Sequence, residues 1–229
     1  KYSRDDWEKE TDLIIDYKIT PDLKPVISKL EHNSKILSNL GELVQGITAY
    51  DKEKGHSEET IKNQTYHSDH KDDDDFQMWL NGNDISRYNY EWNGKWLKYG
   101  PWLARPRLDK KHLFSGPRIL FREVPGKSKR IQACFVENDT YFHGHSVTPF
   151  KLFDSIKINI LFILGIVNSK LMSFYANHKL SNFGKDIFPK LNPQDIKSLP
   201  IVNIDISKKE DLLIHDLDVF LGQKNYQSL

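Results

Sequence analysis

Residues 156–177 read IKINILFILGIVNSKLMSFYAN, the longest strongly apolar stretch of the chain. From Ile160 to Val167 nearly every side chain is apolar, and from Asn168 onward apolar residues recur at helical spacing. This pattern predicts one helix that is buried at its start and half exposed at its end. The fully apolar part is eight residues long, whereas a membrane span needs roughly 20. We therefore expect a core helix and no membrane contact, with three leucines in the core: Leu161, Leu164 and Leu171.

Length and cysteine content limit the class of protein. With 229 residues the chain can bury one good core, or one core and a small accessory piece. Cys134 is the single cysteine, so no internal disulfide can form, and a reducing, cytoplasmic location is expected. The chain begins at Lys1 without a signal-peptide pattern, and we expect it to be a fragment of a longer protein.

Other patterns predict short helices and strands on both sides of the central helix. In chain order they are a short helix from Pro21 to about Asn33, strands around Gly41, a long mobile loop over 51–75, a hairpin turn at Asn93-Gly94, strands over 116–124, 131–138 and 146–150, and an amphipathic helix over 208–221. The predicted fold class is α+β, a twisted, mostly antiparallel sheet with a central buried helix and flanking N- and C-terminal helices.

The charge changes sign along the chain, although the whole chain carries only +1. Residues 51–84 hold ten acidic residues and four lysines, a net charge of −6, whereas residues 85–131 hold twelve basic and three acidic residues, a net charge of +9. Eight aromatic residues are interleaved with the basic ones: Tyr88, Tyr90, Trp92, Trp96, Tyr99, Trp102, Phe114 and Phe121. Cations bind phosphates and planar rings stack on bases, so this composition favours a nucleic-acid surface. The alternative is a strand-rich region whose rings form a core and whose cations are solvated.

Two stretches contain candidate metal ligands. HSDHKDDDD at 67–75 crowds histidines and aspartates together, but it lacks the glycine and the ligand spacing of a calcium loop. We interpret it as a solvated acidic loop. His143 and His145 flank Gly144, yet no cysteine or third histidine has the spacing of a zinc site. We therefore predict no metal site in this chain.

Four motifs occur in an order that resembles a known family. They are LNGNDISRYNY at 80–90, GPRILFREV at 116–124, LFILGIVNSKLMSFY at 161–175 and SLPI at 198–201. Together they resemble the TaqI-like C-terminal specificity domain, the target recognition domain of adenine-specific DNA methyltransferases and fused restriction-modification enzymes. ILSNLGELVQGITAY at 36–50 is similar to the start of such domains and of those in type I specificity subunits. The resemblance covers about residues 36–201, and the long acidic segment 51–75 departs from the family.

The resemblance implies two parts with separate roles. Residues 1–35 would be a connecting arm and short helix from a preceding methyltransferase domain, covalently linked in the parent protein, and residues 36–229 would be the target recognition domain. S-adenosylmethionine is expected only in the missing methyltransferase domain, because this chain has no Gly-x-Gly and no adjacent prolines for an Asn-Pro-Pro-Tyr motif. We predict no catalytic residues here. Pro21-Asp22 and scattered Asp-x-Lys triplets match a nuclease motif only at the level expected by chance.

The predicted partner is double-stranded DNA, bound by the basic segment and the loops beside it. Arginine can hold guanine with two hydrogen bonds, so the base contact is assigned to Arg105 or Arg107, whereas lysine meets phosphate as a point charge. The resemblance adds the turn 46–50 as a second reading loop. The predicted DNA-binding set is Gly46, Thr48, Tyr50, Lys95, Lys98, Arg105, Arg107, Lys127, Lys129, Arg130, His143 and His145. Two other functions stay open, a Mg²⁺-dependent nuclease fragment and a protein-interaction domain.

Overall fold

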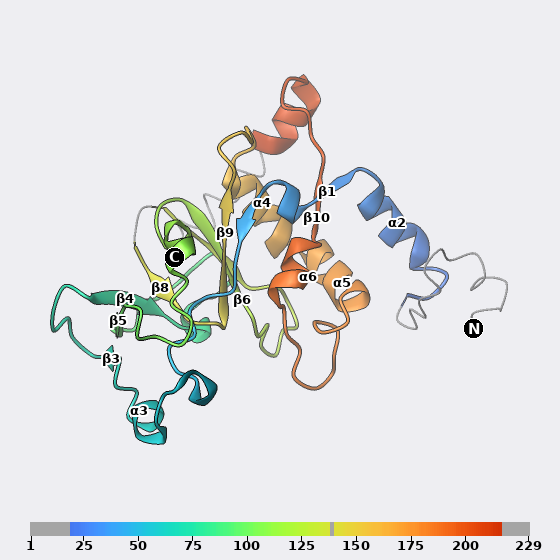
Figure 1. Cartoon of the computed structure of the whole chain (residues 1–229). Helices are drawn as coiled ribbons and strands as arrows, with labels where there is room; N and C mark the ends of the chain where they lie inside the picture. Colours follow the sequence, from blue (N-terminus) through green and yellow to red (C-terminus); the bar gives the residue numbers. More distant parts are fainter. Residues whose placement is uncertain (1–18, 138–139, 217–229) are drawn as a thin grey trace.

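A four-stranded antiparallel sheet forms the centre of the molecule. The computed structural model describes residues 19–137 and 140–216, and the strand order of this sheet is β2–β9–β6–β7 (Figure 1). Its strands are Gly41–Leu43 (β2), Arg118–Arg122 (β6), Ala133–Val136 (β7) and Val147–Leu152 (β9). β6 pairs antiparallel with β7 on one side and with β9 on the other. The strands predicted over 116–124 and 131–138 are therefore confirmed as β6 and β7.

Both faces of this sheet are buried, which explains why β6 is apolar without interruption. Ile119 and Phe121 pack into a cluster that includes Leu164 of the central helix. Leu120 points to the other face and packs with Leu80 and Ile85 in a second cluster. A strand covered on both faces needs apolar residues at odd and even positions alike.

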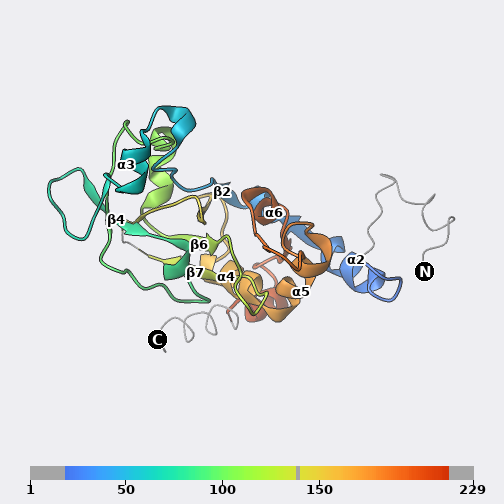
Figure 2. The same cartoon turned by 90° about the horizontal axis from the view of Figure 1, so that it is seen from below.

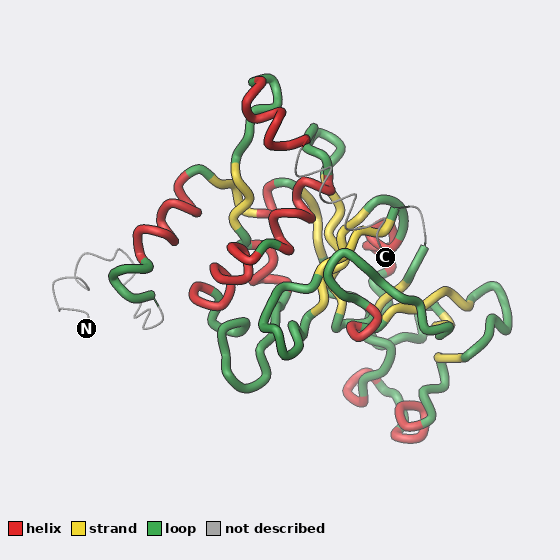
Figure 3. Tube along the Cα trace, turned by 180° about the vertical axis from the view of Figure 1, so that it is seen from behind, coloured by secondary structure: helices red, strands yellow, loops and turns green. Residues whose placement is uncertain are grey.

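Two smaller sheets complete the strands that the structure describes. One has the order β3–β5–β4–β8 and the other pairs β1 with β10. The strands β4 and β8 are parallel, whereas the other strand pairs in these two sheets are antiparallel. Their bounds are Ser34–Ile36 (β1), His67–Ser68 (β3), Phe76–Leu80 (β4), Trp96–Lys98 (β5), Phe142–His143 (β8) and Pro200–Val202 (β10). Most of the helical segments lie to one side of the main sheet, and the sheet with β3, β4, β5 and β8 lies to the other (Figure 3).

The predicted central helix is two helices, Ile160–Asn168 (α4) and Lys170–Lys179 (α5), bent by 62°. Ser169 separates them in an extended conformation, and its Oγ accepts a hydrogen bond of 2.9 Å from the backbone N–H of Met172. The prediction of a single helix is wrong because this serine starts a new helix. Among the described residues, no single helix is long and apolar enough to span a membrane, and only this bent pair reaches that length and composition.

The bend changes which side chains reach the core. Leu161 and Leu164 are buried as predicted, but Leu171 in the first turn of α5 is 51% exposed. The prediction that Leu171 belongs to the core is therefore wrong, because helical spacing cannot be continued across a break between two helices.

Asn168, the last residue of α4, joins the helix pair to the edge of the main sheet. Its Oδ1 accepts a hydrogen bond of 3.1 Å from the N–H of Ala133, and its Nδ2 donates one of 2.8 Å to the carbonyl of the same residue. These are the bonds that a neighbouring strand would make, and Asn168 is fully buried. The backbone carbonyl of Asn168 accepts from Arg87 and Arg130, both at 2.9 Å.

Helices also lie toward both ends of the described chain. The predicted N-terminal helix is confirmed as Lys24–His32 (α2), which extends away from the main sheet and contributes Ile27 to the core (Figure 2). Pro193–Lys197 (α6) begins with a capping box between Asn192 and Asp195. Residues 209–216 are helical, within the helix predicted over 208–221. Residues 217–221 of that helix and residues 1–18 of the predicted arm lie outside the described residues.

The acidic segment 51–75 contains regular structure where a mobile loop was predicted. It holds the 3-10 turn Lys52–Lys54 (η2), the helix Glu58–Lys62 (α3) and strand β3. Ser57 caps α3, its Oγ accepting from the N–H of Thr60 at 3.0 Å. The remaining 3-10 turns are Leu37–Asn39 (η1), Gly82–Asp84 (η3) and Leu108–Phe114 (η4). Low apolar content alone did not reveal the caps and ring contacts that hold this segment.

The first prediction concerns the core position of α4. Leu164→Ala removes a fully buried side chain between the helix and β6, so it should lower the free energy of unfolding by about 2 to 5 kcal/mol. Leu171→Ala on the exposed face of α5 is the matched control and should change it by less than about 0.5 kcal/mol. Urea unfolding of both variants measures the difference, and equal losses would contradict this placement of the two leucines.

The second prediction concerns Asn168. Asn168→Ala takes away the acceptor for the buried N–H of Ala133 and should cost about 1 to 3 kcal/mol of unfolding free energy. Lys170→Ala, two residues further and exposed, should leave stability nearly unchanged. Thermal unfolding followed by circular dichroism compares the two, and an unchanged midpoint for Asn168→Ala would show that the amide does not hold the sheet edge.

Candidate nucleic-acid interface

The segment 44–50 lies at the centre of the predicted DNA-binding residues. On one side the N–H of Gly46 donates to the carbonyl of Val147 at 3.1 Å, and the N–H of Ile47 donates to that of His143 at 2.9 Å. On the other side Thr48 and Arg105 exchange two backbone hydrogen bonds, at 3.2 and 2.9 Å. The structure therefore brings together three predicted segments that are far apart in the sequence, around residues 46–50, 105 and 143–147.

Gly46 is required by this close approach. A Cβ atom at this position would lie 2.1 Å from the carbonyl oxygen of Gly144 and 2.6 Å from that of His143. Both contacts are with backbone atoms, so no side-chain movement could relieve them. Gly46 thus serves the packing of the two segments, and the exposed groups beside it are the candidates for ligand contact.

Two of the predicted cations are exposed and make no ion pair within the described ranges. They are Arg105, held in place through its backbone by Thr48, and Lys127, in the turn between β6 and β7. His145 is also exposed and follows Gly144 at the end of β8. These three side chains can meet a ligand without breaking another interaction of the described residues.

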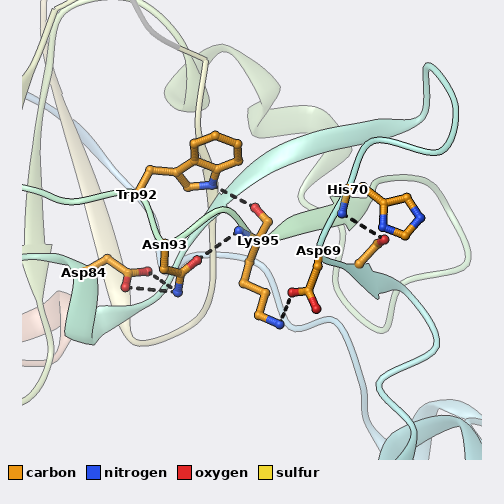
Figure 4. Close-up of polar contacts among 7 residues, drawn as sticks. Asp69, His70, Asp84, Trp92, Asn93 and Lys95 are labelled. Atoms are coloured by element: carbon orange, nitrogen blue, oxygen red, sulfur yellow. Dashed lines mark hydrogen bonds and ion pairs between the residues drawn. The ribbon is translucent and has the colours of Figure 1, made fainter.

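Lys95 and Lys98 are held by the acidic segment. The Lys95 ammonium pairs with Asp69 (Figure 4), and that of Lys98 pairs with Asp73 at 2.9 Å. The neighbouring lysine lowers the pKa of each aspartate, and Asp73 raises the pKa of Lys98. The acidic segment therefore folds back on β5 and neutralises part of the basic segment that the sequence suggested for DNA.

Lys129 and Arg130 also have partners, and Arg107 is half-buried. Lys129 Nζ lies 2.9 Å from an Oδ1 of Asp186, and Arg130 donates through Nη2 to the carbonyl of Asn168. Arg107 adopts a left-handed backbone with φ +57° at the start of η4, and its Nε is buried without a hydrogen-bond partner among the described residues. Arg105 is thus more accessible than Arg107, and Lys127 more accessible than Lys129 or Arg130.

His143 does not belong to an exposed surface. Its side chain is fully buried, its ring lies 4.7 Å from that of Phe114, and burial lowers its pKa well below the usual value. It is a core residue in this structure, and we leave it out of the proposed contact set. His143 is the last residue of β8, whereas His145 lies in the turn beyond it, and the pattern YFHGHS does not reveal where the strand ends.

A polar hollow of about 430 Å³ lies beside His145, and most of its residues were not predicted. Arg122 at the end of β6 donates through Nη2 to Oδ1 of Asn83 at 3.1 Å. Asp84 accepts from the N–H of Asn81 at 2.6 Å and from Nδ2 of Asn93 at 3.2 Å (Figure 4), and burial raises its pKa. The sequence showed these asparagines only as turn signals.

Within the described ranges, no three His, Cys, Asp or Glu side chains gather as a metal site would require. The histidines and aspartates of 67–75 instead make separate local contacts: His67 with Tyr50, His70 with Asp72, Asp74 with Lys71, Asp69 with Lys95 and Asp73 with Lys98.

An aromatic cluster ties the acidic segment to residue 50. The rings of Tyr50 and Tyr66 stack at 5.4 Å, and the Tyr50 hydroxyl lies 2.8 Å from Nδ1 of His67. The His67 ring in turn packs edge-on against Trp79 at 5.1 Å. Burial, together with the nearby Lys95 charge, lowers the pKa of His67 to about 4. Burial raises the pKa of Tyr50 to about 12.

The chain is similar in sequence to a known family and to a known protein. The family model described as the TaqI-like C-terminal specificity domain matches residues 77–201. A Methanocaldococcus jannaschii protein, named as a candidate type II restriction enzyme and methyltransferase, is 29% identical over 143 residues, which are 59% of this chain and 11% of that protein. The chain thus spans about a tenth of that relative.

Solved structures with some likeness have low sequence identity. The HsdS subunit from Thermoanaerobacter tengcongensis has a TM-score of 0.49 at 10% identity, over 93% of this chain and 46% of that one. The type IIL restriction-modification enzyme MmeI, solved in complex with DNA, has a TM-score of 0.45 at 11% identity, over 80% of this chain and 28% of that one.

The third prediction concerns His67. Folded His67 stays neutral down to about pH 4, whereas the unfolded chain binds this proton near pH 6.5, so stability should fall as pH drops from 6.5 toward 4. His67→Phe keeps a ring against Trp79 without the titrating group, and its unfolding free energy should depend less on pH in that window. Urea unfolding of parent and variant at pH 7, 6 and 5 measures the difference. Parallel pH profiles would contradict it.

Proposed function

Because the chain belongs to the TaqI-like C-terminal specificity domain family, we propose that it is a target recognition module that binds double-stranded DNA and supplies target choice without catalysis. The observation that supports this most is the backbone pairing of Thr48 with Arg105 next to the 143–147 segment. It fixes an exposed arginine on a rigid frame between the two sheets. A backbone held in this way keeps the Arg105 side chain at a fixed place on the surface, as specific contact with bases requires.

Each exposed group has a distinct proposed role. Arg105 makes the base contact, since a guanidinium can donate two parallel hydrogen bonds to the edge of guanine. Lys127 contacts phosphate, and Lys129 joins it by exchanging Asp186 for the DNA backbone. His145, with Arg122 and Asn83 in the hollow beside it, offers further donors and acceptors to base edges.

The parent protein is proposed to be an adenine-specific DNA methyltransferase of a restriction-modification system, with or without a fused restriction endonuclease. Support comes from the motifs of the chain and from the name of the M. jannaschii relative. S-adenosylmethionine would bind in the methyltransferase part, and this chain would bind none.

The alternatives make different predictions in the same assays. A Mg²⁺-dependent nuclease fragment would cleave duplex DNA when Mg²⁺ is added. A protein-interaction domain would show no steep loss of DNA affinity with salt, because it would release no counterions from phosphates. A recognition module should bind duplex DNA with a steep salt dependence and leave it intact.

The fourth prediction tests the phosphate contact. Lys127→Ala should weaken binding to every duplex and reduce the slope of log affinity against log salt by about one unit. Lys157→Ala removes an equally exposed lysine beyond the far end of β9 and should change neither quantity. Fluorescence anisotropy with labelled duplexes at several salt concentrations measures both. Equal effects of the two substitutions would place the DNA elsewhere.

The fifth prediction tests base reading. The preferred sequence is first selected from a random duplex library. Arg105→Ala should then reduce the difference in binding free energy between target and random DNA by roughly 1 to 3 kcal/mol. Arg105→Lys keeps the charge but loses the two-pronged donor, so it should restore general affinity without restoring this difference. If Arg105→Ala keeps the full sequence preference of the parent chain, Arg105 does not contact the bases.

A further inference from the structure

The loop 181–190 presents two large apolar side chains to solvent. Ile187 is 75% exposed and Phe188 is 82% exposed, the highest values among the large hydrophobic residues that the structure describes. Phe188 also has φ +55°, a left-handed conformation that is unusual for a bulky residue. A strained aromatic residue at a loop tip is not explained by packing within the described chain, since it contributes nothing to the core.

The base of this loop is rigid, so the tip is held out rather than left loose. Phe183 and Leu191 are buried at the two ends of the loop. The N–H of Lys190 donates to the carbonyl of Asn182 at 3.1 Å, which closes the loop, and the N–H of Leu191 donates to the carbonyl of Glu123 at 2.7 Å. The second bond attaches the loop to the segment that follows β6.

That attachment places the tip on the proposed DNA-binding side. Loop 181–190 and the segment 123–131 project side by side from the lower side of the molecule in Figure 1. The N–H of Glu123 donates to the carbonyl of Ser146 at 2.9 Å, so the same segment also adjoins His145 and the polar hollow.

The surroundings of the tip are cationic. Lys185 precedes Ile187 and is exposed, Lys190 pairs with Glu123 at 3.2 Å, and Lys129 pairs with Asp186 at 2.9 Å. Lys127 is exposed in the adjoining turn. The cores of protein interfaces are depleted of lysine, whereas apolar residues flanked by lysines suit a polyanion with stacked bases. These features favour DNA over a protein as the partner of the tip.

We propose that Ile187 and Phe188 form a wedge that enters the base stack of duplex DNA held by the lysines around it. This inference rests on the proposed function and goes beyond it, because it assigns the loop a role in opening or distorting a base step. Inserted apolar side chains replace part of the lost stacking and kink the duplex, and the separated base step loses stacking energy. The fixed loop base lowers the ordering cost of presenting the wedge.

A pair of duplexes with one sequence tests the wedge. One is fully paired, and the other has a single abasic site at its centre, where the unstacking cost is already met. The parent chain should bind the abasic duplex more tightly by roughly fivefold or more, because the wedge need not unstack a base pair there. Phe188→Ala should remove this preference, and Phe188→Trp should keep it.

Control variants separate the wedge from general affinity and from folding. Phe153→Ala changes another exposed phenylalanine, located after β9 at the end of the sheet away from His145, and should keep the preference. Lys127→Ala should weaken binding to both duplexes by the same factor. Circular dichroism should give equal melting midpoints for the parent and Phe188→Ala, since the side chain is outside the core.

The outcomes distinguish failure of the wedge from failure of the proposed function. Salt-dependent binding with the same ratio of affinities in parent and Phe188→Ala would overturn the wedge alone and would point to a protein surface as the partner of the tip. No salt-dependent binding of either duplex would overturn the wedge and the DNA recognition role together. A preference that Phe188→Ala abolishes and Phe188→Trp keeps supports the wedge.

Discussion

The side chain of Asn168 is the contact on which the arrangement of helices and sheet depends. β7 is the edge of the main sheet, and an unpaired buried edge would leave backbone groups without hydrogen bonds. Asn168 supplies both a donor and an acceptor to Ala133 and thereby takes the place of a further strand. Its own carbonyl, at the end of α4, holds Arg87 and Arg130. One residue thus ends a helix, closes a sheet and fixes the loops on both sides.

Which cations are available to DNA depends less on the distribution of charge along the sequence than on the ion pairs that form in the fold. The basic segment 85–131 carries +9 in sequence, yet two of its lysines, Lys95 and Lys98, are held by aspartates from the acidic segment before it. What faces solvent without an ion pair in the described chain is a smaller set that includes Arg105 and Lys127. Acidic side chains that cover basic ones also weaken non-specific attraction to any polyanion, which leaves more of the affinity to contacts that depend on shape and sequence.

The segment around Gly46 connects the two four-stranded sheets. It continues from β2 of the main sheet and hydrogen-bonds next to β8 of the smaller one, with Arg105 on its other side. The backbone contact is so close that any side chain at Gly46 would collide with it. Exposed groups on this seam are therefore positioned by backbone pairing, which is more precise than positioning by a free loop.

The sequence by itself determined the elements whose signal is local. The apolar runs on either side of the turn at Pro125-Gly126 predicted β6 and β7, and the helix start at Pro21 with one apolar face predicted α2. The long apolar run predicted the buried start of α4. Four ordered motifs also identified the family, which the match over 77–201 bears out. Each of these elements and motifs is specified by residues close to one another in the sequence.

Tertiary structure decided what depends on partners distant in sequence. The helix breaks at Ser169, directly after the Asn168 side chain that hydrogen-bonds Ala133, and the break moved Leu171 from the predicted core to the surface. The burial of His143 and the pairing of Lys95 with Asp69 likewise come from segments that meet only in the fold. Periodicity reports which face of an element is apolar, but it carries no information on which charged or polar groups will lie opposite one another. The candidate site depends on such long-range contacts. The sequence therefore predicted many of its residues without showing which of them are exposed and which are buried or paired.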